Sequence, residues 1–584
     1  MALVLRRCWP VCSRGVTSYP GRILGSQSYS HTRTKNNKLF MKCTSSRGFS
    51  KTAITSSVGI LKSKYPDFDI PTNLSLPQFV LADFDKRGDA VALVNGFTDR
   101  SYTFKQLKNA IHNSASGLSR DGFRQGDVCA IFSPNIPEFF IAFNAVASIG
   151  AINTTVNPLY TVDELANQLN DSESKCIITI PQFADKAREA AEKCSNIKAI
   201  YVFGTEATDG CIPFTKLMED DGSAFPSNIS INPMEDLVVL PYSSGTTGEP
   251  KGVMLSHYNL ISNITQLSYP GLFKYKPDVD CLLGLPPYFH IYGMTMLQSG
   301  LWQGVKHVTL PKFEPEEFLR IIQDYKITCA PIVPPIVLFL AKHPSVDNYD
   351  LSSLKEILSG AAPLGAKIVH AVKDRLDNND LKCRQGFGLT ELSPVVNIGN
   401  LLEDCHPGSV GQLVPNTEAK VVDVKTGEIL GKRQNGELCY RGPQMMKGYL
   451  KNEKATADTI KDGWLHTGDI GFYDNDGQFY VVDRLKELIK YKGFQVAPAE
   501  IEALLLTHTD IKDACVIGIP DEEAGELPKA FVVANSSTVN PKDILSFVES
   551  KVAPHKRLRG GIEFVNEIPK TASGKILRRN LRDI

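Results

Sequence analysis

The sequence predicts an α/β fold, in which a large N-terminal domain of packed, parallel-type sheets with a β-rich subdomain precedes a small C-terminal α+β domain. Three observations predict this arrangement. Strand-like runs alternate with helical patterns early in the chain, short strands separated by turns follow, and strands mixed with two helices fill about the last 100 residues. The length of 584 residues exceeds what one hydrophobic core holds and favours two or more domains.

The alternation begins with β-rich apolar runs that are each followed by a helical pattern, which is typical of parallel sheets covered by helices. The apolar stretch 139–152 is too short to cross a bilayer, so we expect a core helix there and no transmembrane segment. The strand-like runs are 128–132, 176–180 and 199–203, and the helical patterns begin at Phe139 and cover 183–193.

The pattern then changes to short strands around 436–440 and 478–482, with a turn at 474–477, and predicts the β-rich subdomain. In the last part of the chain, Pro498 occupies a favourable first helical position. The predicted strands of the C-terminal domain are 514–519, 530–534 and 562–565, and its predicted helices are 498–506 and 541–551.

Composition limits the cellular setting of the protein. A hydrophobic fraction of 42% with 22% charged residues is ordinary for a soluble globular protein. Residues 1–66 contain twelve Lys or Arg and no Asp or Glu, a composition typical of a mitochondrial transit peptide, although a disordered basic tail without an address has it too. We expect import into the mitochondrial matrix. Residues 582–584, Arg-Asp-Ile, differ from the Ser-Lys-Leu tag of peroxisomal proteins.

All 64 acidic residues follow residue 66, so the rest of the chain is acidic overall. This balance argues against a nucleic-acid partner. The thirteen cysteines form no C-x-x-C pair and have no neighbouring His pairs, so their spacing indicates neither a zinc site nor a disulfide framework.

A Ser-, Thr- and Gly-rich segment follows the strand-like run 236–242. Gly-rich loops after strands cradle phosphates because backbone N–H groups come close to the oxygens, and a nearby Lys neutralises charge; a surface turn is the alternative. The Gly-Lys-Ser/Thr signature of P-loop enzymes is absent, since Pro250 precedes Lys251. The loop comprises Ser243, Ser244, Gly245, Thr246, Thr247 and Gly248, with Lys251 shortly after it.

Four further segments carry groups that suit nucleotide chemistry. Gln385 to Glu391 places Phe387 between two glycines and adds a hydroxyl and a carboxylate. Asp469 follows a Gly and could hold ribose hydroxyls, or it could cap a turn. The basic stretch 484–492 could bind an anionic group of a nucleotide, or it could be a solvated face. Lys575 stands in a Gly-Ser loop nine residues before the end.

Taken in order, these motifs make the chain resemble the AMP-forming adenylate synthetases, the ANL family of acyl-CoA synthetases, peptide-synthetase adenylation domains and luciferases. The similarity runs from about Pro66 to the end and is closest in wording to 4-coumarate-CoA ligases and their luciferase-like relatives. The segments 242–257, 346–365 and 483–502 carry it. The plant 4-coumarate-CoA ligases lack a basic leader such as residues 1–66, and this difference argues against phenylpropanoid chemistry.

The resemblance implies ATP, Mg²⁺ and CoA as cofactors and a role for each motif. Residues 243–251 would close over the β- and γ-phosphates, and Gln385, Gly386 and Phe387 would lie against adenine. Thr390 would contact the α-phosphate, Glu391 would bind Mg²⁺, and Asp469 and Arg484 would bind ribose. Lys575 would bridge the carboxylate and the α-phosphate and stabilise the transition state.

The resemblance also implies a mobile C-terminal domain that rotates between two half-reactions. The expected boundaries are a leader at 1–66, an N-terminal adenylate-forming domain at 67–482, a hinge at 483–486 and a C-terminal domain at 487–584. After rotation, Lys490 would serve thioester formation, and CoA would be bound by Lys312, Lys492, Gly493 and Gln495.

The acid pocket follows from the same resemblance. His290 would gate it, and the other predicted pocket residues are Tyr292, Ala362, Gly386, Pro394 and Val395. Amino-acid-activating relatives typically carry an Asp near position 290, and residues 289–296 contain no acid. We therefore predict an ATP-dependent acid-CoA ligase for an apolar acid, either a medium-chain fatty acid or a 4-coumarate-like aryl acid. The alternative is a luciferase-like monooxygenase that oxidises the adenylate, although luciferases usually carry a small residue in place of Pro394.

Overall fold

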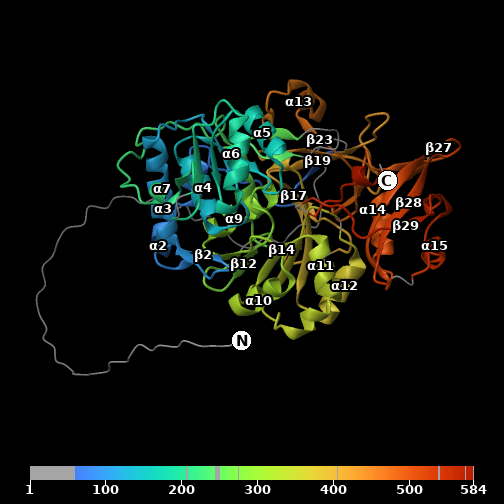
Figure 1. Cartoon of the computed structure of the whole chain (residues 1–584). Helices are drawn as coiled ribbons and strands as arrows, with labels where there is room; N and C mark the ends of the chain where they lie inside the picture. Colours follow the sequence, from blue (N-terminus) through green and yellow to red (C-terminus); the bar gives the residue numbers. More distant parts are fainter. Residues whose placement is uncertain are drawn as a thin grey trace, which may run out of the picture. The chain divides into compact units, whose positions relative to one another are not determined.

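The computed structural model describes residues 59–205, 208–243, 250–273, 275–362, 364–403, 406–492, 494–536, 539–571 and 574–582 (Figure 1). The predicted leader therefore lies outside the described residues up to residue 58. The described part has four sheets and belongs to the predicted α/β class, with a separate C-terminal sheet.

The first nine-stranded sheet in the described part is parallel from β9 to β8 and antiparallel at its other edge, where β10, β11 and β21 lie. Its middle strand β4 is buried at every position, as expected for a strand covered on both faces, and the strands predicted around 128, 176 and 199 are confirmed. In sheet order the strands are β10 (Tyr242–Ser243), β11 (Lys251–Ser256), β9 (Leu237–Val239), β5 (Ile152–Val156), β4 (Val128–Phe132), β6 (Ser174–Thr179), β7 (Ala199–Val202) and β8 (Ile212–Pro213), and β21 (Gly448–Tyr449) pairs with β11.

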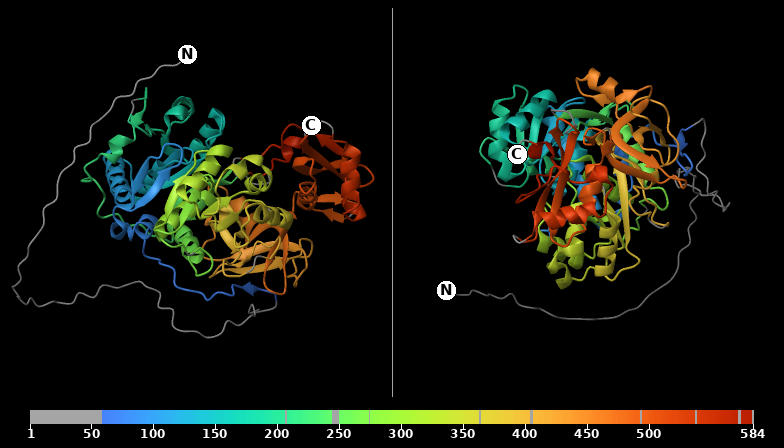
Figure 2. Two further views of the ribbon diagram at one scale, coloured as in Figure 1. Left: turned by 90° about the horizontal axis from the view of Figure 1, so that it is seen from below. Right: turned by 90° about the vertical axis from the view of Figure 1, so that its right-hand side faces the viewer.

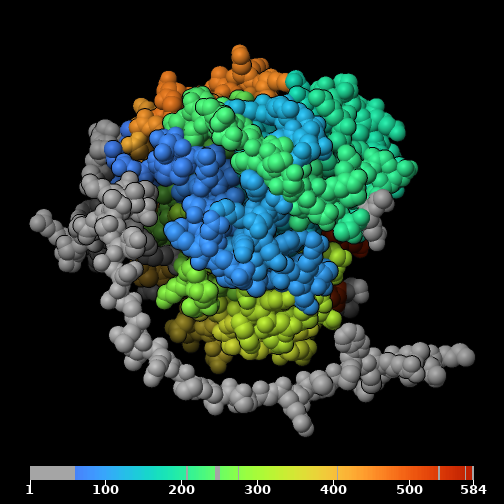
Figure 3. Space-filling view, turned by 90° about the vertical axis from the view of Figure 1, so that its left-hand side faces the viewer, coloured from blue at the N-terminus to red at the C-terminus, as the bar shows by residue number. Residues whose placement is uncertain are grey.

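The first part of the chain also contains helices, and its residues, coloured blue to green, form much of the face seen in Figure 3. The predicted core helix is α4, which begins with Pro137 in its first turn and is 12 residues long. Among the described residues, no helix is long and apolar enough to cross a membrane. These helices are α1 (Leu76–Val80), α2 (Phe84–Arg87), α3 (Phe104–Arg120), α4 (Pro137–Ser148), α5 (Val162–Asp171), η1 (Pro181–Phe183), α6 (Ala184–Glu192), α7 (Thr215–Met218) and α8 (His257–Leu267).

The second nine-stranded sheet of the described part is also parallel at its centre. A fully buried ion pair joins Arg384 of β16 to Glu356 of the neighbouring β15, and the guanidinium lies 5.1 Å from the ring of Phe273. In order the strands are β18 (Gln412–Leu413), β17 (Val395–Ile398), β16 (Lys382–Gly388), β15 (Glu356–Ser359), β14 (Cys329–Ile332), β12 (Cys281–Gly284), β13 (Lys306–Thr309), β2 (Val91–Asn95) and β3 (Ser101–Thr103).

The helices that connect the strands of this sheet begin at local start signals in the sequence. Pro315 and Pro334 each stand in the first turn of a helix, where a missing N–H costs nothing, and the His290 side chain caps the helix that follows it. The elements are α9 (Ile291–Gln303), α10 (Pro315–Tyr325), α11 (Pro334–Lys342), η2 (Pro344–Asn348), α12 (Ala366–Arg375) and η3 (Thr390–Leu392).

The predicted β-rich subdomain is a six-stranded antiparallel sheet in the described part. Strand β24 continues to Arg484, so the first two residues of the predicted hinge are strand residues. The strands are β1 (Leu61–Lys62), β19 (Glu418–Val422), β20 (Gly436–Arg441), β23 (Trp464–Tyr473), β22 (Ile460–Lys461) and β24 (Phe479–Arg484), with the helix α13 (Glu453–Thr459) before β22.

The C-terminal part has its own five-stranded sheet and its own apolar core (Figure 2). Its strands match the predicted pattern closely. The two predicted helices start at the prolines that the sequence indicated, Pro498 and Pro541. The elements are β26 (Phe494–Val496), β25 (Ile489–Tyr491), β28 (Gly525–Ala534), β27 (Ile511–Asp521), β29 (Ile562–Phe564), α14 (Pro498–Leu505), α15 (Pro541–Glu549), η4 (Pro554–Lys556) and α16 (Arg579–Arg582).

Candidate active site

A cavity of about 730 Å³ lies at the carboxyl ends of β15 and β16. Carboxyl ends of parallel strands are where open α/β sheets commonly bind ligands. Strands β10 and β11, the loop before α9, the six-stranded sheet and the Lys575 loop supply its other walls. The predicted site residues that line it are Ser243, Lys251, His290, Tyr292, Gly386, Phe387, Thr390, Glu391, Pro394, Val395, Arg484 and Lys575.

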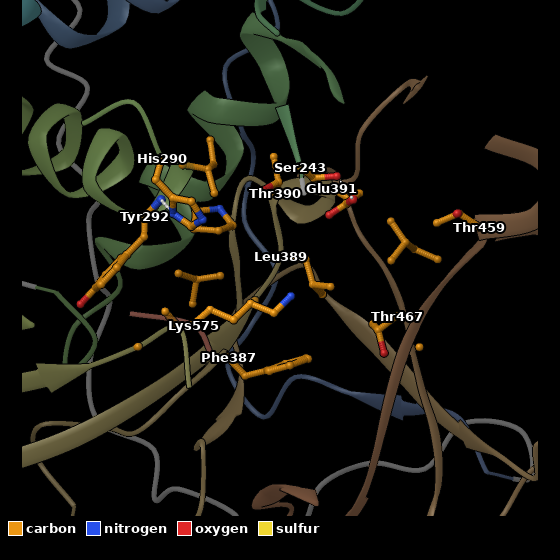
Figure 4. Close-up of a pocket in the computed structure, with 18 of the residues that line it drawn as sticks. Ser243, His290, Tyr292, Phe387, Leu389, Thr390, Glu391, Thr459, Thr467 and Lys575 are labelled. Atoms are coloured by element: carbon orange, nitrogen blue, oxygen red, sulfur yellow. Dashed lines mark hydrogen bonds between the residues drawn. The ribbon is translucent and has the colours of Figure 1, made fainter. Parts of the chain in front are cut away.

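The Glu391 carboxylate is buried and is held by residues distant in sequence. Its Oε1 accepts hydrogen bonds from Ser243 Oγ at 3.1 Å and from the Tyr449 hydroxyl at 2.8 Å. The Lys251 ammonium lies 5.3 Å from the centre of the Tyr449 ring. Tyr449 therefore connects the lysine after the Gly-rich loop to the carboxylate of η3, with Thr390 next to it in Figure 4. No local motif indicated Tyr449, because only the pairing of β21 with β11 brings it here.

Asp469 and Arg484 face each other across β23 and β24, where they are paired in register. The Arg484 Nε lies 3.4 Å from Asp469 Oδ1, and the buried Oδ2 has no hydrogen-bond partner among the described residues. Burial raises the pKa of Asp469 to about 6, although the charges of Arg484 and Lys575 oppose that rise. Asp469 itself is not among the lining residues, although its neighbours Thr467 and Gly468 are. An unpartnered buried oxygen at this position is suited to accept a hydroxyl group.

Lys575 projects into the cavity from a tight C-terminal loop. Gly574 has a φ of 80°, and a Cβ there would come within 3.2 Å of Val333, so the close approach of this loop to the second sheet requires glycine. In Figure 4 the ammonium group points between Phe387 and the Thr390–Glu391 turn. Burial lowers the pKa of Lys575 to about 8, with a further lowering by Arg484, while Asp469 opposes it. Together with Arg484, the lysine makes this wall suited to an anion.

His290 and Tyr292 form the apolar end of the cavity. His290 Nδ1 accepts the N–H of Tyr292 at 3.3 Å, and burial, followed by the charge of Lys575, lowers the pKa of His290 to about 4. The imidazole is therefore neutral at physiological pH. The Tyr292 hydroxyl donates to the carbonyl of Leu358 at 3.1 Å, which leaves its ring as a wall. Phe273, Leu358, Pro394, Val395 and Ile398 complete this end.

Phe387 offers a fixed aromatic face to the cavity. Its ring centre lies 5.9 Å from that of Tyr440, whose hydroxyl donates to Asn397 at 2.6 Å. Gln385 is not among the lining residues, because its side-chain amide is hydrogen-bonded to both backbone groups of Leu364, at 2.8 and 3.2 Å. It supports the adjoining backbone instead of contacting a ligand. After the neighbouring strand β15, Ala361 lines the cavity in place of the predicted Ala362.

The structure keeps the residues predicted to serve the second half-reaction away from this cavity. Lys490 and Gln495 are exposed on the hairpin of β25 and β26, and Lys492, also exposed, is paired with Glu523 at 2.6 Å. Lys312 lines a second, mostly apolar cavity of about 240 Å³. The loop residues Ser244, Gly245, Thr246, Thr247 and Gly248 and the residue Gly493 lie outside the described residues.

Comparisons with known proteins agree with this architecture. Residues 82–450 match the model of the AMP-binding enzyme family, and residues 500–575 match that of the AMP-binding enzyme C-terminal domain. The chain is 46% identical to 4-coumarate–CoA ligase 1 of Petroselinum crispum, over 90% of this chain and 96% of that protein. The corresponding values for 4-coumarate–CoA ligase of Vanilla planifolia are 45%, 90% and 96%.

Solved structures show the same fold. The anthranilate CoA ligase AuaEII in complex with anthranoyl-AMP has a TM-score of 0.80 and 27% identity, covering 88% of this chain and 98% of that chain. ATP-bound MatB from Rhodopseudomonas palustris has a TM-score of 0.77 and 25% identity, covering 87% and 99%.

Asp469→Asn is expected to stabilise the ligand-free protein in a pH-dependent manner. Because the folded-state pKa is raised, the stability that this group contributes is complete below its unfolded value near 3.8 and is lost as the pH rises through about 6. Asn does not titrate, so the variant should gain roughly 2 kcal/mol in the free energy of unfolding at pH 8 and clearly less at pH 5. Urea unfolding at both values measures this, with the exposed Asp476→Asn as control. An equal gain at both pH values would contradict the raised pKa.

Proposed function

Because the chain belongs to the AMP-binding enzyme family and is an adenylate-forming acid-CoA ligase of the 4-coumarate-CoA ligase type, we propose that its cavity converts an apolar carboxylic acid into an acyl-AMP and then into an acyl-CoA. The observation that carries the proposal is the convergence of Lys575, Arg484 and Glu391 on one cavity whose other end is apolar. The positive groups suit a phosphate and the apolar end suits an acyl group.

In the first half-reaction, an oxygen of the substrate carboxylate attacks the α-phosphorus of ATP, the bond to the β-phosphate oxygen breaks, and pyrophosphate leaves. Lys575 would bind the carboxylate and the α-phosphate together, and Thr390 would donate to an α-phosphate oxygen. Positive charge placed where negative charge develops lowers the barrier to such transfers. With a pKa of about 8, Lys575 is mostly protonated near neutral pH.

The nucleotide would be held along the rest of the cavity. Phe387 presents a flat face for adenine, with the Gly386 backbone beside it, and Asp469 Oδ2 would accept ribose hydroxyl groups with Arg484 adjacent. Ser243 and Lys251, with the rest of the Gly-rich loop, would bind the β- and γ-phosphates. The lining of the cavity supports these assignments except that of Asp469, which does not line it. The assignment of Asp469 is supported by its buried Oδ2, which has no hydrogen-bond partner among the described residues.

Glu391 would hold Mg²⁺, which when bound neutralises part of the triphosphate charge. Carboxylate oxygens are the protein ligands that Mg²⁺ prefers. The donor fits, because both described hydrogen bonds to this carboxylate end on Oε1, from Ser243 and Tyr449. The chain itself keeps the carboxylate in place through these two hydroxyl groups.

The second half-reaction would follow rotation of the C-terminal domain about residues 483–486. The CoA sulfur attacks the acyl carbonyl carbon, its proton goes to solvent, and the bond to AMP breaks. Lys490 would enter the site in place of Lys575. The exposure of Lys490 while Lys575 lines the cavity supports this alternation. Lys492, Gly493 and Gln495 would contact CoA, and the apolar slot beside Lys312 offers room for its pantetheine arm.

The acid would be apolar, either a medium-chain fatty acid or a 4-coumarate-like aryl acid. The wall that contains His290, Tyr292 and Leu358 is neutral, since His290 is uncharged. Such a wall gives an α-ammonium group no partner, so it disfavours amino acids. Gly386 lines the cavity and has no side chain, so it takes no room from the acid.

The test of the function is acid-dependent pyrophosphate release and acyl-CoA formation by the full chain, with a panel of C6 to C16 fatty acids, cinnamates and benzoates. We expect both products with one class of apolar acid and neither with amino acids. Pyrophosphate release with an amino acid, or without any acyl-CoA from an acid of the panel, would contradict the proposal.

Lys575→Ala should reduce pyrophosphate release by about 100-fold or more, as for the loss of other groups that stabilise developing charge, and should leave thioester formation from supplied acyl-AMP nearly intact. Lys490→Ala should do the reverse. Lys512→Ala, an exposed lysine on β27, serves as the control. Equal loss of both half-reactions in Lys575→Ala would contradict this division of roles.

We place the enzyme in the mitochondrial matrix on the basis of the acid-free basic leader. A fusion of residues 1–66 to a fluorescent protein should accumulate in mitochondria and be shortened by processing. The matched control replaces the leader's arginines by glutamine. A fusion that stays in the cytosol would exclude this localisation.

A further inference from the structure

Three side chains that can bind a metal lie beside the bulged segment of β23 that precedes Asp469. Glu437 and Cys439 are two residues apart on β20, and Cys439 is paired in register with His466 on β23. Positions i and i+2 of a strand point to the same face, and a registered partner lies beside them. The pairing of the two strands therefore brings a carboxylate, a thiol and an imidazole together. A register shift between Glu437 and Cys439 marks an irregularity at this point of the ladder.

The donor atoms already have spacings close to those of a tetrahedral metal site. Cys439 Sγ lies 3.4 Å from His466 Nδ1, which lies 2.7 Å from Glu437 Oε2, and the three ligand atoms all lie within 4.8 Å of one another. With metal–ligand bonds of 2.0 to 2.3 Å, tetrahedral zinc separates its ligand atoms by roughly 3.3 to 3.7 Å. The nitrogen–oxygen spacing has to open by about 0.6 Å when a metal binds between the two atoms, while the sulfur–nitrogen spacing already fits.

The second shell and the access route are also present. Glu437 Oε1 accepts the N–H of Gly468 at 3.0 Å, which leaves Oε2 for a metal and fixes the carboxylate, as outer partners do in metal sites. Cys439 is fully buried, while Glu437 and His466 line the 730 Å³ cavity. A fourth coordination position therefore opens to the cavity, where a water molecule can occupy it.

The charges of the ligand set balance a divalent ion. A carboxylate and a thiolate neutralise it, so the metal-loaded site carries no net charge beside Lys420 and Lys461, which act on the cluster electrostatically. The thiol proton goes to solvent when the sulfur binds the metal. One sulfur and one imidazole ligand favour a borderline-soft ion such as Zn²⁺ over Mg²⁺.

We propose that Glu437, Cys439 and His466 bind one thiophilic divalent cation, with Zn²⁺ as the reference ion, and that the bound metal weakens nucleotide binding. The first part stands on geometry alone. The second part rests on the proposed ribose role of Asp469. Opening of the His466–Glu437 spacing shifts the bulged segment of β23 from Thr467 to Asp469, because the Gly468 N–H donates to the same carboxylate. The cysteine spacing in the sequence did not indicate this site, because its ligands come from two strands.

The direct test is titration of the metal-stripped full-length protein with Co²⁺ in a thiol-free reductant. We expect one equivalent to produce a near-ultraviolet thiolate-to-cobalt band and visible bands of tetrahedral cobalt, all displaced by Zn²⁺. Cys439→Ser should remove the charge-transfer band and weaken Zn²⁺ binding by at least about 100-fold, since even outer-shell changes cost 10- to 100-fold. Cys515→Ser, a buried cysteine in the C-terminal sheet, should leave both unchanged.

Folding is checked by the metal-free adenylation rate, which Cys439→Ser should leave unchanged, and His466→Gln provides a second ligand variant. In the wild type, saturating Zn²⁺ should raise the KM for ATP several-fold, and Cys439→Ser should abolish that rise. The absence of a cobalt band, or a band that survives in both ligand variants, would overturn the metal site. A band without any change in KM would overturn only the coupling to nucleotide, and would do so independently of whether the enzyme forms acyl-CoA.

Discussion

The arrangement of the site depends on the mutual compensation of charges around one cavity. Lys575 and Arg484 bring positive charge to one wall, and Asp469 lies behind it as a buried carboxylate. Neighbouring charges act on Lys575 in opposite directions: Asp469 opposes the burial that lowers the pKa of Lys575, while Arg484 adds to it. The compensation is incomplete, since one oxygen of Asp469 has no hydrogen-bond partner in the part of the chain that the structure describes. A ligand that brings both hydroxyl groups and an anionic phosphate completes the balance, which is why binding energy is available here.

The scaffold makes this incomplete balance tolerable. Two sheets with parallel centres bury their strands between helices, and the ion pair of Arg384 with Glu356 joins β15 to β16 beneath the acyl end of the cavity. The ends of these two strands carry Gly360 and Gly386 to the wall of the site. Strain and desolvation at a binding site are commonly offset by such a rigid surround. The nucleotide end, in contrast, is completed by a β-rich sheet and by a loop of the C-terminal part.

Hydroxyl groups rather than charges perform much of the positioning. Tyr449 holds the carboxylate of Glu391 while its ring lies against Lys251, and Tyr292 is held by the carbonyl of Leu358. Neither bond adds charge to the cavity, so the positive wall remains available for phosphate. Gln385 also positions its neighbours without adding charge, because its side-chain amide is hydrogen-bonded to the backbone of Leu364 and supports the cavity wall.

The sequence by itself determined the α/β class, most of the helices and strands, and many of the residues that line the cavity. It could do so because hydrophobic periodicity, helix-starting prolines and Gly-rich loops are local signals. Only the tertiary structure decided that Ala361 rather than Ala362 reaches the cavity, that Gln385 turns toward Leu364, and that Tyr449 joins Lys251 to Glu391. It also decided that Cys439 stands opposite His466. These facts depend on strand register and on backbone turns, which bring together residues up to about two hundred positions apart and leave no local pattern in the chain.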